Sequence, residues 1–286
     1  MANLKEIRNR ISSVSSTMQI TSAMKMVSAA KLKKAQDAIT AMRPYANKLT
    51  ELLQSLSATL DGDTGSKFAN KRDINKVLIV AITSNRGLCG GFNSNIIKES
   101  TRLANEVYAN QEVSFVVIGK KANDVLSKSF NVVSNNSEVF DDLTFNNVAE
   151  IAQMLMNKFE EDEFDKIELV YNKFKNAATQ IIMMEQFLPI VPAEGEENLN
   201  LDYIFEPSKV EIIETLIPKS LKTQLYKAVR DSFASEHGAR MTAMHKATDN
   251  ATELRDELLL TYNKARQAAI TNEILEIVGG AEALNN

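Results

Sequence analysis

Few residues in this chain have types and spacing that could support chemistry, and the first group follows an apolar run. Segment 83–93, TSNRGLCGGFN, comes directly after apolar residues 76–83 and before a helical pattern. Many α/β proteins bind phosphate at this position, because glycines let the backbone approach the ligand and a helix N-terminus attracts anions. The segment lacks both the G-x-G-x-x-G spacing and the Lys-Ser/Thr pair of a P-loop. We therefore interpret Gly87, Gly90 and Gly91 as the glycines of a tight turn.

A nucleophile or a metal site would need partners that the spacing does not provide. Cys89 is the only cysteine, and the two histidines, His237 and His245, lie far from it in the sequence, so we expect no Cys–His pair. The histidines are about 12 Å apart along a helix, too far to share one zinc ion, and we interpret both as exposed. The acidic run 160–163 is typical of a solvated helix end. The sequence predicts no catalytic residue, no cofactor and no metal site.

Composition and charge limit the class of protein. The single cysteine fits a reducing compartment, and no run of eighteen apolar residues is long enough to span a bilayer. The apolar repeat begins directly after the first residues, so we expect no signal or transit peptide. Residues 1–48 carry nine Lys or Arg against two carboxylates, whereas residues 73–218 carry twelve basic and 23 acidic side chains. The two regions therefore meet different partners, and either nucleic acid or an acidic protein surface fits the basic one.

A seven-residue apolar repeat predicts one long helix over residues 1–60. The apolar positions are Leu4, Ile7, Ile11, Val14, Met18, Leu32, Ala35, Ile39, Met42, Ala46, Leu49, Leu53, Leu56 and Leu60. A helix of this length cannot bury its own apolar stripe and needs a partner. The same register places polar residues at Thr21, Lys25 and Ser28. These either select the register of a coiled coil or face something other than the partner helix.

The rest of the chain divides into an alternating region, 73–206, and a second long helix, 208–286. Strands are predicted at 76–83, 113–119, 166–172, 179–190 and 201–207, and helices at 94–109 and 147–160. This alternation favours a small doubly wound domain. The apolar positions of the second helix are Ala247, Ala251, Leu254, Leu258, Tyr262, Ala265 and Ala269, close to eleven residues per three turns. The predicted fold class is α/β, a domain joined to an antiparallel coiled coil of the N- and C-terminal helices.

Four separated segments of the chain resemble the gamma subunit of F-type ATP synthases. They are ITSAMKMVSAAKLKKAQ (20–36), SNRGLCGGFN (84–93), ARMTAMHKATDNA (239–251) and YNKARQAAITNEILEIVGGAEAL (262–284). The family's C-terminal signature is matched at Ile270, Thr271, Glu273, Glu276, Gly280, Ala281 and Ala283. The segments occur in the family's order, and the resemblance covers nearly the whole chain.

The resemblance implies a rotor shaft and not an enzyme. In the family, the coiled coil enters a hexamer of three alpha and three beta subunits, and a Rossmann-like foot domain contacts the epsilon subunit and the membrane-embedded c ring. Proton or sodium ion flow turns the ring, and the chemistry belongs to beta. The resemblance therefore implies a non-catalytic subunit without nucleic acid, at the cytoplasmic face of the bacterial inner membrane. It would associate with the membrane only through the complex.

Contact residues are implied where the family's motifs match. Arg266 and Gln267 match positions that contact a catch loop of beta, and Thr271 and Glu273 follow in the same stretch. The basic helix face opposite beta's acidic helix-turn-helix is matched by Met24, Lys25 and Lys31. The foot segment that faces the polar loops of the c ring is matched by Tyr203, Phe205 and Glu206.

Two other classes of protein share parts of this pattern. A basic coiled-coil arm on a globular body occurs in RNA-binding enzymes, but residues 1–44 contain no aromatic side chain on which bases could stack. An α/β domain suggests a nucleotide-dependent enzyme, but segment 83–93 is not a complete phosphate loop. RNA binding or tight ATP binding by the isolated chain would favour these alternatives.

Overall fold

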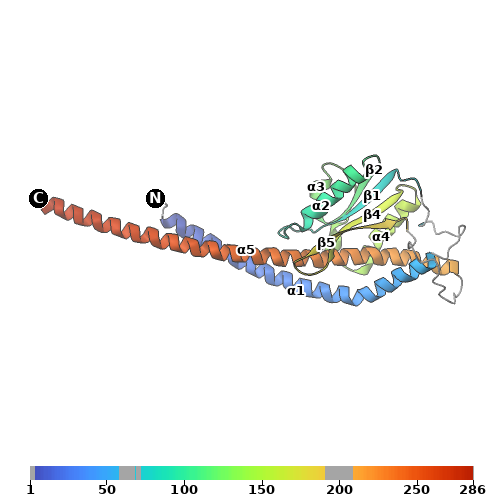
Figure 1. Cartoon of the computed structure of the whole chain (residues 1–286), viewed down its shortest axis with the longest axis horizontal. Coiled ribbons are helices and arrows are strands. Elements are labelled where there is room, and N and C mark those ends of the chain that lie inside the picture. Colours follow the sequence, from blue (N-terminus) through green and yellow to red (C-terminus); the bar gives the residue numbers. More distant parts are fainter. Residues whose placement is uncertain (1–3, 58–67, 69–71, 191–208, 286) are drawn as a thin grey trace. The chain divides into compact units, whose positions relative to one another are not determined.

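The computed structural model describes residues 4–57, 68, 72–190 and 209–285 (Figure 1). The chain divides into two compact units, each described here by itself. The coil unit consists of Met1–Ser28 with Met241–Asn286, and the sheet unit consists of Ala29–Arg240. The predicted strand 201–207 lies outside the described residues.

The sheet unit contains one five-stranded sheet in the order β3-β2-β1-β4-β5. The strands are β1 Lys76–Ile82, β2 Glu112–Ile118, β3 Asn131–Asn135, β4 Lys166–Phe174 and β5 Gln180–Leu188. The first four strands pair in parallel, and β5 is antiparallel to β4. In β1 every residue from Val77 to Ile82 is buried, as expected for a central strand with helices on both faces. The sequence predicted β1, β2, β4 and β5 but not the short edge strand β3.

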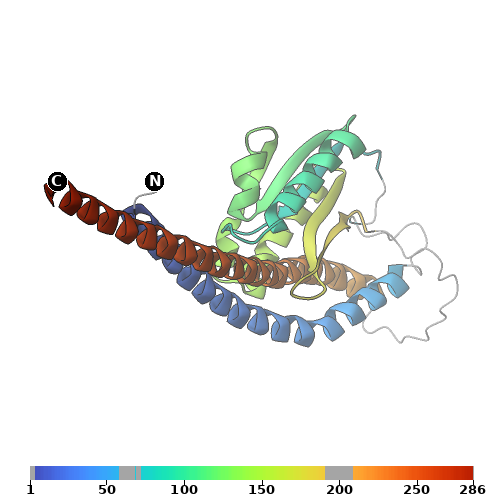
Figure 2. The same ribbon diagram turned by 60° about the vertical axis from the view of Figure 1, so that its left-hand side comes forward.

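Helices cover both faces of this sheet. The shorter elements are α2 Phe92–Arg102, the π-helix η1 Leu103–Val107, α3 Lys120–Leu126, the 3₁₀-helix η2 Ser137–Phe140 and α4 Phe145–Glu160. One face packs its apolar side chains against α2, η1 and α3, and the other packs against α4 and the first part of the long helix α5, Lys209–Asn285 (Figure 2). The predicted helices 94–109 and 147–160 correspond to α2 with η1 and to α4.

The two terminal helices are α1 Leu4–Ser57 and α5 Lys209–Asn285, and each contains one proline. In the sheet unit, α5 buries Leu221, Leu225 and Val229 against the sheet and α4. Its Gly238 lies against the turn between β4 and β5, where an added Cβ would be 3.2 Å from backbone atoms of Ala177. Glycine lowers helix propensity by about 1 kcal/mol relative to alanine. The close approach of the two backbones accounts for its presence here.

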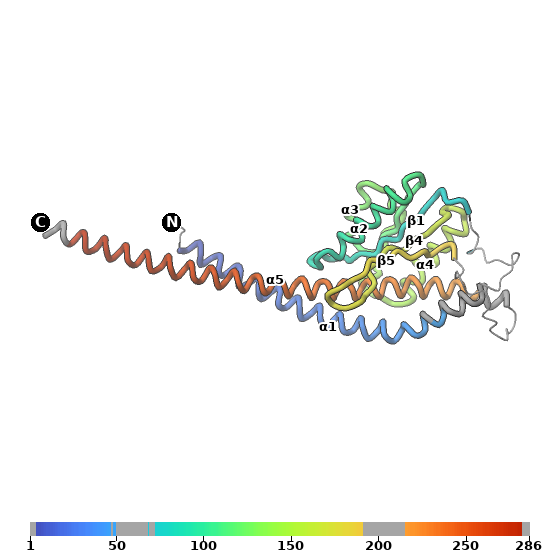
Figure 3. The backbone as a smooth tube through the Cα atoms, in the orientation of Figure 1, coloured from blue at the N-terminus to red at the C-terminus, as the bar shows by residue number. Residues whose placement is uncertain are grey.

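The coil unit pairs the start of α1 with the end of α5 in opposite directions (Figure 3). The predicted repeat of α1 is confirmed, because every described seam position, from Leu4 through Leu49 in the two units, is buried or half-buried. The prediction for α5 was wrong at Leu254, whose side chain is 46% exposed. Ala247 and Thr252 are half-buried, and a continuous series of buried or half-buried positions runs through Met244, Thr248, Ala251, Arg255, Leu258, Tyr262, Ala265 and Ala269. These steps of four and three residues match the heptad of α1, since two helices share a continuous seam only when their periods agree.

Candidate functional site

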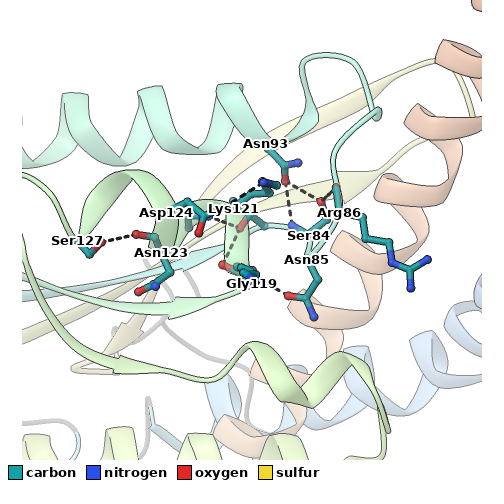
Figure 4. Close-up of polar contacts among 12 residues, drawn as sticks. Ser84, Asn85, Arg86, Asn93, Gly119, Lys121, Asn123, Asp124 and Ser127 are labelled. Atoms are coloured by element: carbon teal, nitrogen blue, oxygen red, sulfur yellow. Dashed lines mark hydrogen bonds and ion pairs between the residues drawn. The ribbon is translucent and has the colours of Figure 1, made fainter.

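The loop after β1 is held together by its own polar groups (Figure 4). The backbone N–H of Ser84 donates to Asn93 Oδ1 at 2.9 Å, and the Ser84 hydroxyl donates to the Arg86 carbonyl at 2.6 Å. Asn85 accepts from the Lys120 N–H at 3.0 Å and donates to the Ser137 carbonyl at 2.9 Å. The Ser84 backbone N–H and the side chains of Ser84 and Asn85 thus bind other parts of the protein. This arrangement agrees with the interpretation of the loop as a structural turn.

Gly119 joins β2 to α3 directly beneath this loop. Its φ of +119° is rarely adopted by residues with a side chain. A Cβ at this position would also collide with the backbone carbonyl of Thr83. The hydroxyl of Thr83 accepts from the Ala122 N–H at 3.0 Å, which satisfies one free donor at the start of α3. Close contact between two strand ends therefore requires glycine here.

Cys89 is buried inside the same loop. Its Sγ lies 3.2 Å from Asn93 Nδ2, which donates to it. Burial raises the pKa of the Cys89 thiol, and the nearby Arg240 only partly offsets this rise. Because the thiolate is the reactive form, this environment disfavours a nucleophilic role.

Arg240 fastens α5 to the loop after β1. Its Nη2 donates to the carbonyls of Arg86 at 3.1 Å and Gly87 at 3.2 Å, and its Nη1 lies 2.6 Å from Glu236 Oε1. Both side chains of this ion pair are about nine-tenths buried. Burial raises the pKa of Glu236, while Arg240 acts to lower it. The sequence signal was the spacing of Glu236 and Arg240, one helical turn apart, but such pairs are common on exposed helix faces.

The prediction of two exposed histidines was wrong for His237. Its side chain is buried and packs edge-on against Phe233, with 4.5 Å between ring centroids. Burial lowers the pKa of His237 to about 4, and the charges of Arg240 and Lys31 act in the same direction. The Phe233 ring, four residues earlier on α5, gives the imidazole an apolar environment. His245 is exposed, as predicted, and lies 3.3 Å from Asp249.

The acidic run at the end of α4 is engaged by basic side chains. Lys158 Nζ lies 2.6 Å from Glu163 Oε2, and Arg72 pairs with Asp162. Among the described residues, no group of three or more His, Cys, Asp or Glu side chains could hold a metal ion.

Polar residues within the α1 seam face α5 in the coil unit. The hydroxyls of Thr21 and Thr248 are 2.8 Å apart, and Thr21 is buried. Lys25 Nζ lies 3.4 Å from His245 Nδ1. Of the two interpretations of this polar stretch, the structure favours selection of the pairing register, because Thr21 and Lys25 both contact α5. The Thr21 hydroxyl also donates to the Met18 carbonyl of its own helix at 3.1 Å.

Contacts along the coil unit keep one constant register. Arg8 lies beside Tyr262, with Nη2 2.7 Å from the hydroxyl, and Thr252 donates to Met18 Sδ at 3.3 Å. These two contacts and the Thr21–Thr248 contact show that each step forward along α1 corresponds to an equal step back along α5. Extending this register places Arg266 opposite Leu4, where the described part of α1 begins. Residues of α5 beyond that level continue past the start of α1 (Figure 3).

The residues predicted to contact beta fall into separate groups. Met24 and Lys25 are half-buried in the coil unit. Arg266, Gln267, Thr271 and Glu273 are exposed on α5, and the Thr271 hydroxyl donates to the Gln267 carbonyl at 2.9 Å. By the coil register, about 20 residues of helix, or about 30 Å, separate the level of Met24 from that of Arg266. Lys31 is exposed and belongs to the sheet unit. Tyr203, Phe205 and Glu206 lie outside the described residues.

Sequence matching did not single out the exposed apolar end of α5 as a surface. Residues 270–281 are all exposed. The large apolar side chains among them are Ile270, Ile274, Leu275, Ile277 and Val278, which are 49–72% exposed. Apolar residues concentrated on an exposed helix indicate a surface that another molecule covers. No helix in the described part of the chain is long and apolar enough to cross a membrane.

Comparisons with known proteins identify the family of the chain. A family model described as ATP synthase matches residues 3–284. The chain is 75% identical to the ATP synthase gamma chain of Flavobacterium psychrophilum, over 99% of each chain, and 72% identical to that of Flavobacterium johnsoniae, over 100% of each.

Solved structures give the same result. A chain from the central stalk and c-ring of the Tetrahymena thermophila mitochondrial ATP synthase is 26% identical, with a TM-score of 0.62, covering 80% of this chain and 99% of that one. A chain from the Euglena gracilis mitochondrial ATP synthase is 23% identical, with a TM-score of 0.71 over 98% of this chain and 94% of that one, and shares its fold. On these grounds, the chain belongs to the ATP synthase gamma-chain family.

Proposed function

We propose that this chain is the central-stalk rotor subunit of a bacterial F-type ATP synthase. In this role it transmits torque between an ion-driven c ring and a catalytic hexamer of alpha and beta subunits, during synthesis or hydrolysis of ATP. The observation that carries the proposal is the exposed apolar end of α5, residues 270–281, on a chain of the gamma family. A shaft enclosed by a ring of subunits needs such a surface.

The coil unit would turn inside the hexamer. Arg266 and Gln267 would contact a catch loop of beta, with Thr271 and Glu273 in the same contact region. Met24, Lys25 and Lys31 would face an acidic surface of beta, which suits the basic charge of the N-terminal region. Exposed charge pairs each contribute only about 0–1 kcal/mol, so such contacts can separate at every step of rotation.

The foot of the shaft would lie near the membrane. The Rossmann-like domain, residues 73–206, would contact the epsilon subunit, and Tyr203, Phe205 and Glu206 would face the c ring. The chain itself would be non-catalytic and would attach peripherally to the cytoplasmic face of the inner membrane through the complex. The contacts of Ser84 and Asn85 with other parts of the protein and the burial of Cys89 are consistent with a structural role for the loop after β1.

Reconstitution tests the proposal. The purified chain alone is expected to hydrolyse no ATP, and its addition to alpha and beta is expected to yield an active, rotating complex. ATP hydrolysis by the isolated chain, or a fully coupled enzyme assembled without it, would contradict the proposal.

Site residues require a separate experiment. Replacing Arg266 and Gln267 together with alanine should impair assembly or torque coupling while leaving the far-UV circular dichroism of the chain unchanged, because both side chains are exposed. Lys264→Ala, also exposed on α5, is the matched control. If helicity and coupling fell in parallel, the effect would be one of folding and not of subunit contact.

A further inference from the structure

A cationic cavity lies within the sheet unit, away from the surfaces discussed above. Its volume is about 480 Å³, within the range of small-molecule sites. It is lined by Arg43 of α1, Lys173 and Phe174 of β4, Lys175 directly after that strand, Ile181 of β5, and Lys227 and Asp231 of α5. Four of its five charged side chains are positive, in contrast to the acidic composition of residues 73–218. This charge excess favours an anionic occupant.

The one carboxylate of the cavity, Asp231, is buried and incompletely bonded. Its side chain is 2% exposed, and its Oδ1 accepts no hydrogen bond. The nearest cation is Arg43, whose Nη2 lies 3.7 Å from that oxygen, longer than a charge-assisted hydrogen bond. Buried polar atoms normally have a hydrogen-bond partner, so this oxygen is an acceptor available to a donor that enters the cavity.

Among the described residues, no carboxylate lies within ion-pair distance of Lys173, Lys175 or Lys227. Asp231 interacts with Lys173 and Lys227 only at longer range. Lys173 belongs to β4, and Lys175 follows directly after the last residue of that strand. Phe174 and Ile181 add an apolar wall, against which a sugar or a base could pack.

We propose that this cavity binds a small phosphate-bearing anion that also carries a hydroxyl donor. Its phosphate groups would lie among the lysines and Arg43, and its hydroxyl would donate to Asp231 Oδ1. An acidic peptide fits less well, because a cavity of this volume with a buried acceptor suits a compact ligand that offers both negative charge and a hydrogen-bond donor.

Binding to the purified full-length chain tests the site. Inorganic tripolyphosphate and ATP serve as soluble probes in isothermal titration calorimetry, and vesicles containing phosphatidylglycerol test a lipid headgroup as the source of the phosphate. Replacing Lys173 and Lys227 together with glutamine should raise the dissociation constant about tenfold or more, since two charge-assisted contacts are lost. The affinity should also fall as salt is added. Far-UV circular dichroism would establish that the variant is folded.

Matched variants separate the site from general charge. Replacing Lys98 and Lys120 with glutamine, two exposed lysines outside the cavity, should leave the affinity unchanged. Asp231→Ala should reduce the ratio of ATP to tripolyphosphate affinity, because only ATP offers hydroxyls. Lysine-dependent binding of soluble phosphates or of vesicles supports the site and identifies the source. Because these lysines line the cavity and lie outside segment 83–93, such binding would not favour a nucleotide-dependent enzyme with a phosphate loop there. No binding, equal loss in the control, an unchanged affinity ratio, or stronger binding of polyglutamate would each overturn the proposal.

Discussion

Substitution of Arg240 by alanine should destabilise the sheet unit strongly. The change removes donors from two loop carbonyls, at 3.1 and 3.2 Å, and leaves the buried carboxylate of Glu236 without its partner at 2.6 Å. Removing one member of a buried ion pair typically costs about 3–5 kcal/mol, because an uncompensated charge remains in the interior. Since the Glu236 side chain is only 10% exposed, water can compensate little of this loss.

The loss should depend on pH. Burial already raises the pKa of Glu236 above its ordinary value, and Arg240 limits that rise, so the pKa should increase further in the variant. A carboxyl with a raised folded-state pKa contributes most stability below its unfolded pKa, about 4.3, and loses it as pH rises through the folded pKa. The difference between variant and wild type should therefore be smallest near pH 4 and largest at neutral pH.

Urea unfolding of the full chain at pH 4.5 and 7.5 measures this difference. Arg102→Ala is the control, because Arg102 forms an ion pair with Glu99 on an exposed helix face and should contribute little. The double variant Glu236→Gln with Arg240→Met should be more stable than Arg240→Ala at neutral pH, since it leaves no buried charge. The reasoning would be refuted if Arg240→Ala cost no more than the control, or if its cost were the same at both pH values.

Three further changes test other parts of the structure. Gly119→Ala should lower the free energy of unfolding by about 2–4 kcal/mol, measured with urea, because of backbone strain and a collision with the backbone. Gly87→Ala, whose added Cβ would have no atom within 4 Å, is the control. Equal losses in the two variants would contradict the role assigned to Gly119. The wild type should lose about 3 kcal/mol of unfolding free energy as pH falls from 6.5 to 4, because His237 takes up a proton in the unfolded chain but, with a pKa of about 4, not in the folded one. His237→Leu should remove this loss. Parallel pH profiles of the variant and the wild type would show that His237 is not responsible. Thr21→Val and Thr248→Val should each lower the free energy of thermal unfolding by about 1 kcal/mol, and the double variant should lower it by less than the sum of the two. Strictly additive losses would exclude the inter-helix hydrogen bond.

The sequence predicted the elements whose side chains follow a long or uniform pattern. The heptad of α1 and the apolar strand β1 were both confirmed, since each is read from many residues at once. The strand β3 was missed because it has five residues at the sheet edge, with asparagines at both ends. The helix α3, with seven residues, is too short for a helical period to appear.

Side-chain environments were harder to predict than elements. The buried state of His237 depends on packing in the sheet unit, and the hydrogen bonds of Arg240 reach a loop about 150 residues away in the sequence. The seam of α5 was misassigned at Leu254 because its own residues allow two periods, and only pairing with α1 selects one. The contact residues implied by family resemblance stay predictions, since their partners belong to other chains.

The exposed end of α5 has a consequence for how assembly could be followed. Beyond the level of Leu4 the helix has no described coil partner, and it contains adjacent glycines, Gly279 and Gly280, each of which weakens a helix by about 1 kcal/mol relative to alanine. Isolated helices of about a dozen residues are only marginally stable in water. Amide hydrogens of the last turns should therefore exchange rapidly in the free chain and slowly once a surrounding ring encloses them. The rate of amide hydrogen exchange in the C-terminal turns would then report on assembly without any added label.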